Sequence, residues 1–196
     1  MTKKEMIIFG EFCRVNTTGE AYDLLEKYPN LLKLTDEDGY NVLMLARFPK
    51  IVEVLLNVGI DIHAKNNEGM TALHVWAAYY PDAEAIELLL EHNAEIDTID
   101  SYGQTPLISA FYNNHLEVAE DLVNANAALN IQDINGNTIL HFAVDRGKVK
   151  FARLLLKHGA DTNIQNDRGD TPRSLGLRQH TPSMVKLLNK YNDKNN

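Results

Sequence analysis

The chain has 196 residues, of which 44% are hydrophobic and 23% are charged, so it can bury the core of one or two soluble domains. Its net charge is −8 at pH 7, from 19 basic and 27 acidic residues. A protein surface that binds many phosphate groups is normally positively charged, so this excess of acidic residues argues against binding to nucleic acid or acidic membranes. The single cysteine, Cys13, excludes an intramolecular disulfide and a cysteine-based zinc site.

The N-terminal region predicts no targeting signal. An apolar run from Met6 to Phe9 is interrupted by Glu11 and is followed by no small-residue cleavage site. No stretch approaches the ~20 apolar residues that cross a membrane. We therefore expect a cytoplasmic protein whose cysteine is reduced. Residues 1–35 predict two short helices, one containing Phe12 and the next running from Ala21 to Leu25.

From residue 36 onward the sequence repeats itself. Five glycines, each followed two residues later by asparagine or threonine, are spaced 30, 34, 33 and 33 residues apart: Gly39, Gly69, Gly103, Gly136 and Gly169. The threonines at 71, 105, 138 and 171 predict helix N-caps, because a hydroxyl can accept an unpaired amide there. A second helix is predicted to end at Gly59, Asn93, Asn126 and Gly159, because these residue types adopt the left-handed conformation most readily.

These motifs resemble the ankyrin-repeat family. The resemblance is carried by Gly-Gln-Thr-Pro-Leu (103–107), Gly-Asn-Thr-Ile-Leu-His-Phe-Ala (136–143) and Leu-Leu-Leu-Lys-His-Gly-Ala-Asp-Thr-Asn (154–163). It implies an all-α solenoid of helix–turn–helix units with β-hairpin-like finger loops. Residues 1–35 would form a degenerate N-terminal capping repeat, and the array at 36–190 would contain repeats at about 36–65, 66–99, 100–132, 133–165 and 166–190. Residues 191–196 would form a disordered tail.

Two histidines, His74 and His141, follow the same Gly-x-Thr-x-Leu lead-in. In the family this histidine typically hydrogen-bonds within and between repeats. The two lie two repeats apart, and each repeat adds about 10 Å, so their rings cannot share a metal. Met44 and Ile108 hold the same position in other repeats, which a catalytic residue would not tolerate. We therefore predict a structural role, and the sequence assigns no catalytic residue, metal ligand or cofactor.

The resemblance also implies that fingertips and the exposed face of each first helix bind a partner protein. The residues at these positions are Tyr40, Phe48, Met70, Tyr79, Tyr80, Tyr102, Gln104, Tyr112, Asn113, Ile134, Asn135 and Arg146. Tyrosine, phenylalanine and methionine are enriched at recognition surfaces, so the aromatic residues of repeats two and three are the expected centre of binding. Alternatively, some of the tyrosines only pack against neighbouring repeats.

Two repeats are irregular. The first is three residues short between its helices, so Pro49 is predicted to start the second helix directly. The second is one residue long, and Trp76 stands where other repeats have alanine. Either a one-residue bulge restores Ala77 to this position, or the extra residue lies in the loop after the helix and Trp76 is forced into a small site. We favour the bulge.

Asn130 and Asn163 each stand eight residues after a leucine, Leu122 and Leu155. This arrangement resembles sites used by asparaginyl hydroxylases that act on ankyrin repeats. The alternative is that both asparagines only make local hydrogen bonds.

Taken together, the motifs predict a monomeric, non-enzymatic protein–protein interaction module that binds another protein through its concave face and finger loops. The alternative is a bacterial effector or regulatory inhibitor that recruits or blocks one enzyme, in which case the protein would be secreted and act in a host cell.

Overall fold

The computed structural model of the chain describes residues 1–179 and 181–192, and it forms two compact units, residues 1–101 and 102–196. Unit 1 contains α1 (Lys3–Phe12), α2 (Thr18–Lys27), a short 3₁₀ helix (Pro29–Lys33), α3 (Val42–Leu45), α4 (Pro49–Asn57), α5 (Ala72–Tyr79) and α6 (Ala83–Glu91). Unit 2 contains α7 (Pro106–Tyr112), α8 (Leu116–Asn124), α9 (Ile139–Asp145), α10 (Val149–Lys157), α11 (Pro172–Arg178) and α12 (Pro182–Asn192). The described residues form helices and no β-strand, so the predicted all-α fold is confirmed.

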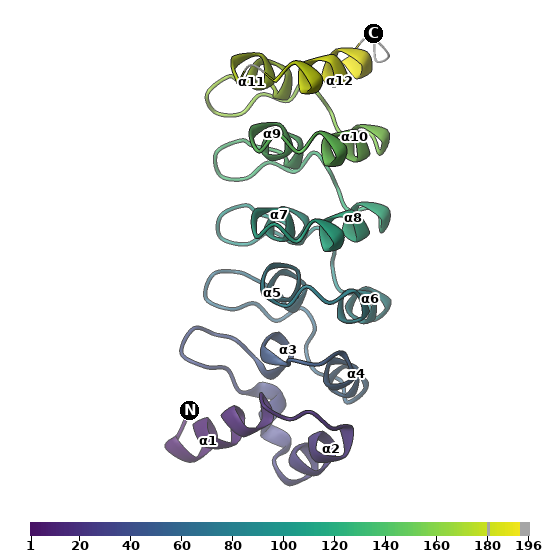
Figure 1. The fold of residues 1–196 in the computed structure, drawn as a ribbon. Helices are drawn as coiled ribbons and strands as arrows, with labels where there is room; N and C mark the ends of the chain where they lie inside the picture. Colours follow the sequence, from purple (N-terminus) through teal and green to yellow (C-terminus); the bar gives the residue numbers. More distant parts are fainter. Residues whose placement is uncertain (180, 193–196) are drawn as a thin grey trace. The chain divides into compact units, whose positions relative to one another are not determined.

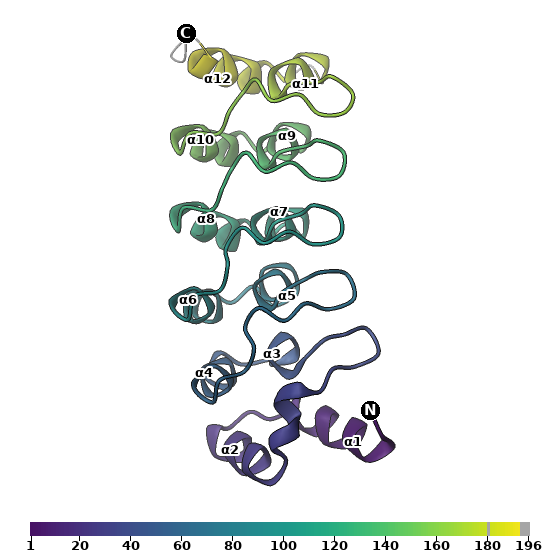
Figure 2. The ribbon, with the colours of Figure 1, turned by 180° about the vertical axis from the view of Figure 1, so that it is seen from behind.

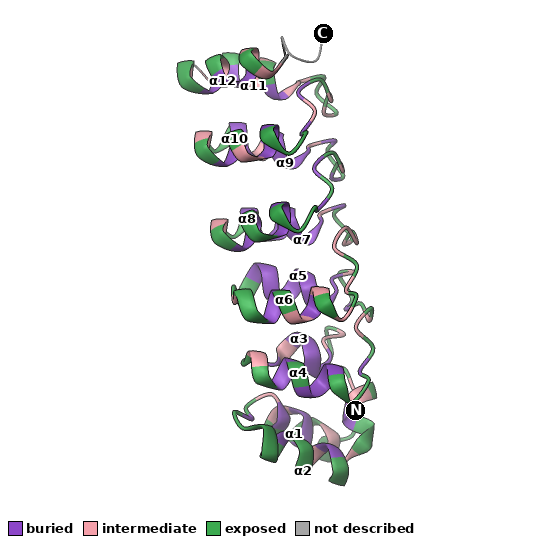
Figure 3. Ribbon diagram, turned by 90° about the vertical axis from the view of Figure 1, so that its right-hand side faces the viewer, coloured by how far each residue is buried: buried purple, intermediate pink, exposed green. Residues whose placement is uncertain are grey.

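Each repeat contributes two helices that lie side by side and a loop that projects beyond the first of them (Figures 1 and 2). We call these loops the fingers, residues 34–41, 64–71, 98–105, 131–138 and 164–171. In both units, buried residues follow one another along the helices, whereas exposed residues are frequent in the fingers and on the second helices (Figure 3). The leucine that follows each of the first four finger glycines by four residues lies at the centre of this core: Leu43, Leu73, Leu107 and Leu140 are all fully buried.

The helix starts and ends that we predicted from capping residues are observed at those residues. The Thr105 hydroxyl accepts a hydrogen bond from the Ile108 amide at 3.3 Å, so it caps α7 as expected. Asn41 caps α3 in the same way, through a 3.0 Å bond from the Met44 amide. At the ends of the second helices, Asn93 and Asn126 have φ angles of 64° and 66°, in the left-handed region.

The fingers are joined by single backbone hydrogen bonds. In unit 1 the Asn67 amide donates to the Asp38 carbonyl at 2.9 Å, and in unit 2 the Asp167 amide donates to the Asn135 carbonyl at 3.0 Å. One such bond at each step is too few to define a strand between fingers, and within the first finger Thr35 and Asn41 form only an isolated antiparallel bridge. The turn requires glycine: Gly136 has a φ of 75°, and a Cβ there would lie 2.8 Å from the Asp167 amide nitrogen.

The predicted bulge at Trp76 is wrong. Helix α5 is a regular α-helix in which the Tyr80 amide donates to the Trp76 carbonyl at 3.1 Å, and the extra residue extends α5 to eight residues, compared with seven in α7 and α9. Trp76 is 1% exposed, and its indole N–H donates to the Leu43 carbonyl at 3.0 Å. Helix α3 ends at Leu45, after only four residues, so no backbone amide of that helix donates a hydrogen bond to the Leu43 carbonyl. Trp76 therefore fills the space beside a shortened helix and caps it.

At the two ends of the chain, the observed helices agree in part with those predicted from the sequence. Phe12 and Ala21 lie in α1 and α2, as predicted, and both are buried. At the other end, α12 continues to Asn192, so the helix includes two residues that the sequence had assigned to the tail. Residues 193–196 lie outside the described part of the chain.

Candidate interaction surface

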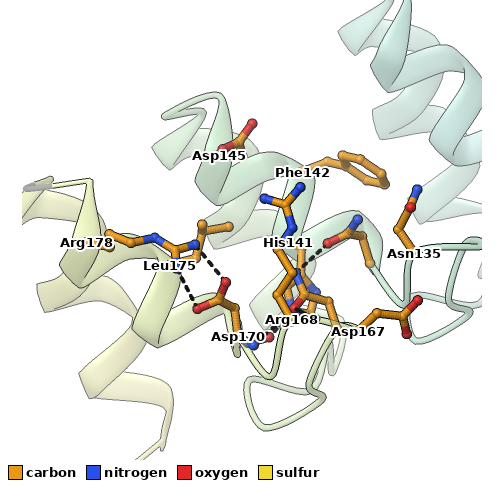
Figure 4. A pocket seen from close by; sticks show the side chains of 11 residues that line it. Asn135, His141, Phe142, Asp145, Asp167, Arg168, Asp170, Leu175 and Arg178 are labelled. Atoms are coloured by element: carbon orange, nitrogen blue, oxygen red, sulfur yellow. Dashed lines mark hydrogen bonds and ion pairs between the residues drawn. The ribbon is translucent and has the colours of Figure 1, made fainter.

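A polar hollow of about 280 Å³ in unit 2 lies between the fingers and first helices of the fourth and fifth repeats (Figure 4). Its lining residues come from four segments: the finger residues Asn135 and Asn137, the α9 residues His141, Phe142 and Asp145, the finger residues Asn166, Asp167, Arg168 and Asp170, and the α11 residues Leu175 and Arg178. Of the twelve binding residues named above, Asn135 lines it.

The shape of the hollow depends on asparagine and aspartate side chains in the fingers. Asp133 Oδ1 accepts hydrogen bonds from the Asn135 and Asn137 amides at 2.9 and 2.7 Å. Asn166 forms the same turn one repeat later, and its Nδ2 also donates to Asn137 Oδ1 at 2.9 Å. This role was not predicted from the sequence. The available signal was an aspartate or asparagine three residues before each finger glycine.

His141 lies at the base of the hollow and is 1% exposed. Its Nδ1 accepts from the Thr138 amide at 3.1 Å, so its Nε2 carries the proton and donates to the Asp170 carbonyl of the next finger at 3.0 Å. Burial lowers the pKa of this imidazole below its ordinary value, although the bond to Asp170 partly opposes the shift. The histidine is thus held neutral and links two repeats, as the sequence predicted.

At one wall of the hollow, Asp170 and Arg178 form an ion pair. The Arg178 guanidinium donates two hydrogen bonds to the two carboxylate oxygens, at 3.0 and 2.7 Å. Donation from Arg178 is the main cause of a lowered pKa of the Asp170 carboxyl. Ser174 replaces histidine in this repeat, and its hydroxyl accepts from the Thr171 amide at 3.0 Å, so the helix start keeps its cap.

Arg146, a predicted binding residue, is already engaged within unit 2. Its Nη1 donates to the Tyr112 carbonyl at 2.8 Å and to the Phe111 carbonyl at 3.3 Å. The guanidinium also lies 4.6 Å from the centroid of the Tyr112 ring, which in turn packs edge-on against Phe142 at 6.0 Å. Asn113 Nδ2 donates to the Ser109 carbonyl at 3.0 Å. Arg146 therefore ties α9 to the end of α7, although its side chain remains exposed.

Two fingertip residues of unit 2 present large apolar side chains to solvent. Tyr102 is 50% exposed and Ile134 is 61% exposed. The Ile134 amide donates to the Tyr102 carbonyl at 3.0 Å, so the two residues lie on adjacent fingertips. We call them the Tyr102–Ile134 pair. Gln104, at the base of the same finger as Tyr102, is half-buried.

Unit 1 carries the other aromatic candidates. Tyr79 is 53% and Phe48 38% exposed, whereas Tyr80 is half-buried and its ring lies 5.6 Å from that of Trp76. Tyr40 is also half-buried, and burial, Tyr79 and Glu68 together raise the pKa of its hydroxyl. Tyr40 and Tyr79 therefore lie near each other on this unit.

Met70 was predicted to be an exposed binding residue, and this prediction is wrong. Its side chain is 5% exposed. The position directly after the finger glycine points back toward the start of the helix, as the half-buried Gln104 and Asn137 also show. The tip of the finger lies one or two residues before the glycine, where Tyr102 and Ile134 are found. An apolar residue after the glycine therefore belongs to the core.

The two asparagines proposed for hydroxylation are both exposed. Asn130 Oδ1 accepts from the Asp161 amide of the next repeat at 2.9 Å, and the Asn163 amide donates to Asp161 Oδ1 at 2.8 Å. Asn130 thus bonds the backbone of the next repeat and not a local group, and hydroxylation stays a prediction.

Burial raises the pKa of the Cys13 thiol to about 11, so the group is protonated at neutral pH. Within residues 1–179 and 181–192, no group of three or more histidine, cysteine, aspartate or glutamate side chains is placed to hold a metal ion. None of the helices in the described part of the chain has the length and apolar character needed to cross a membrane.

Comparison with known proteins agrees with this geometry. A family model described as ankyrin repeats in three copies matches residues 43–133, and another described as ankyrin repeats in many copies matches residues 122–175. The crystal structure of the ankyrin repeat domain of Bcl-3, described as a unique member of the IkappaB protein family, superposes with a TM-score of 0.79 at 32% identity, covering 87% of this chain and 76% of that domain. The chain belongs to the ankyrin-repeat family.

Curated ankyrin-repeat relatives match a shorter part of the chain. The B-cell lymphoma 3 protein homolog of Mus musculus is 40% identical over 91 residues, which cover 42% of this chain and 20% of that protein. A putative ankyrin repeat protein of Rickettsia bellii is 42% identical over 69 residues, covering 35% of this chain and 38% of that protein. The match to the mouse protein thus spans about a fifth of its length.

Proposed function

We propose that this ankyrin-repeat chain is a protein-interaction module that binds a partner protein through its fingertips and the exposed ends of its first helices. The observation that carries the proposal is the Tyr102–Ile134 pair. Half or more of each side chain faces solvent on adjacent fingertips, in positions where the fold itself does not need a large apolar group. Tyrosine and other large apolar residues are the usual anchors of protein interfaces, because they bury much area at a low entropic cost.

We further propose that the chain acts by binding and not by catalysis. The ring nitrogens of His141 cap a helix and bond the next finger, so they already have structural roles, and the Cys13 thiol is protonated at neutral pH, which makes it a weak nucleophile. A prefolded surface loses little conformational entropy when it binds, which suits a scaffold of this kind. The effector or inhibitor alternative stays a prediction.

The test is a comparative affinity capture from a lysate of the native cell, read by mass spectrometry. The double variant Tyr102→Ala/Ile134→Ala removes the fingertip pair from unit 2. The double variant Ile7→Ala/Tyr22→Ala is its matched control, because it removes the same two residue types at 57% and 47% exposure from α1 and α2. Circular dichroism melting establishes that both variants are folded.

We expect at least one protein to be captured by the wild type and by the α1–α2 control and lost with the fingertip variant. Removing two anchor residues should weaken such a complex by at least about tenfold. If the fingertip variant captures the same proteins as the wild type, the Tyr102–Ile134 pair is not the binding surface. If the wild type captures nothing above a blank resin, the interaction function itself is contradicted.

A further inference from the structure

A cluster of positive charge lies on the second helices of unit 2, away from the fingers. In α10, Lys150, Arg153 and Lys157 are spaced three and four residues apart, so they share one helix face. In α12, Lys186 and Lys190 stand 33 residues after Arg153 and Lys157, at the equivalent positions of the next repeat. All five side chains are exposed. We call this surface the α10–α12 cationic face.

The charges of this face are not neutralised within unit 2. The ion pair that occurs among the described residues joins Arg178 to Asp170, in the finger hollow. The five cations of the α10–α12 face therefore have no carboxylate within ion-pair distance in the part of the chain that the structure describes, and their charge faces solvent.

The same positions have the opposite charge in earlier repeats. Position for position, α8 carries Glu117 and Glu120 where α10 carries Lys150 and Arg153. Helix α6 of unit 1 carries glutamate at all three positions: Glu84, Glu87 and Glu91. Residues 66–145 contain no lysine or arginine at all. The change of sign at equivalent positions is not required by the fold, because exposed residues of either charge suit the solvent side of a helix.

The dimensions of the cationic face limit what it can bind. Lys150 to Lys157 spans about 10 Å along α10. Helix α10 contacts α12 on one side and α8 on the other (Figures 1 and 2), and Glu117 and Glu120 of α8 are exposed. An extended phosphate surface, such as duplex nucleic acid or a membrane, would continue past the two basic helices and meet these carboxylates. A short anionic segment would not.

We infer that the α10–α12 cationic face docks a short acidic segment of a protein partner. This surface lies on second helices and is separate from the fingertips, so the inference goes beyond the proposed fingertip function. Each exposed ion pair contributes little, so binding needs several pairs at once and weakens when salt screens them. The acidic stretch of residues 66–145 would repel such a segment and direct it to this face.

The test measures fluorescence anisotropy of a labelled oligoglutamate peptide of about eight residues, long enough to cross both helices when extended. We expect saturable binding at low ionic strength that weakens at least about fivefold near physiological salt. The variant Lys150→Glu/Arg153→Glu/Lys157→Glu gives α10 the charge pattern of α6. It should lower the affinity at least about tenfold, because three attractive contacts become repulsive.

The matched control is Lys3→Glu/Lys4→Glu/Lys33→Glu, which makes the same change in net charge with three exposed lysines of unit 1. We expect the control to stay within about twofold of the wild type, with both variants shown to be folded by circular dichroism. An equal loss in the control would show that net charge, not this face, governs binding. Tighter binding of duplex DNA or phosphatidylserine vesicles than of the peptide would overturn the protein-segment assignment, and so would the absence of saturable peptide binding.

Discussion

Neighbouring repeats are joined differently in the two units. In unit 1, α5 reaches α3 through the buried indole of Trp76, which donates to the Leu43 carbonyl. In unit 2, the position equivalent to Trp76 is Ala143, which is fully buried, and the link from α9 to α7 is made at the surface by Arg146. Helix α3 has four residues and α7 has seven. The length of one helix thus decides the size of the side chain that its neighbour needs.

The fingers differ between the units in a similar way. In unit 2, Asn166 Nδ2 donates to Asn137 Oδ1. In unit 1 the equivalent nitrogen, Asn66 Nδ2, is buried and has no acceptor at hydrogen-bond distance among the described residues; Tyr40, whose hydroxyl interacts with the Asn66 side chain, stands where unit 2 has Asn137. A buried donor without an acceptor costs free energy, so the buried polar groups of the first fingers are less fully hydrogen-bonded than those of the last fingers. The same backbone is therefore stabilised unequally along the chain.

The largest effect is expected at Trp76. Trp76→Ala should lower the free energy of unfolding by about 3–5 kcal/mol, because it leaves a cavity and an unpaired carbonyl beside α3. Trp76→Phe keeps most of the volume and should cost clearly less. Chemical denaturation followed by circular dichroism measures both. A Trp76→Ala variant as stable as the wild type would show that the residue is forced into its site.

The converse substitution tests whether helix length is the cause. Ala143→Trp places the same side chain beside the full-length α7, where no space or free carbonyl is available. We expect a loss of about 1–3 kcal/mol from overpacking, measured by the same denaturation. If tryptophan stabilises the regular repeat as well, then the shortened α3 does not explain Trp76.

An intermediate effect is expected at His141, and it depends on pH. Burial lowers the pKa of this group in the folded state below the ordinary 6.5, so the unfolded chain binds the proton more readily. The contribution of His141 is therefore full above pH 6.5 and is lost as the pH falls through 6.5 toward the lower folded pKa. His141→Ile, which copies Ile108 of the preceding repeat, should cost about 1–3 kcal/mol at neutral pH.

The pH dependence separates this mechanism from simple packing. Between about pH 7 and about pH 5, the wild type should lose more stability than His141→Ile, as measured by denaturation at each pH. Parallel curves for the two proteins would show that His141 does not titrate between the folded and unfolded states.

The smallest effect is expected at Arg146. Arg146→Ala removes hydrogen bonds to two carbonyls of α7 and the contact with Tyr112, and we expect a loss of about 1 kcal/mol, since the side chain is exposed. Arg153→Ala is the control, because this arginine is exposed on α10 and should change stability by less than about 0.5 kcal/mol. Equal stability of both variants would return Arg146 to the set of purely binding residues.

Much of the fold could be predicted because its signals are local. The threonine caps, the glycine and asparagine helix ends and the buried leucines depend on backbone conformation and on neighbours within one repeat, so a sequence period reveals them. The histidine role at His141 followed for the same reason, since its bond to Thr138 spans three residues. The binding surface was less predictable, because Met70 and Ile134 differ only by their place in the finger turn and yet one is buried and the other exposed.

The sequence by itself determined the repeat, the helix caps at its threonines, glycines and asparagines, and the all-α class, because each of these follows from short-range chemistry recurring at a fixed period. Tertiary structure alone decided what the exceptions do. Trp76 is accommodated because α3, a repeat away in sequence, is too short to supply a donor for its Leu43 carbonyl, which accepts from the indole instead. Arg146 is held by hydrogen bonds to carbonyls of α7. Both outcomes depend on contacts between residues more than thirty positions apart, and a single sequence carries no direct record of which distant residues meet.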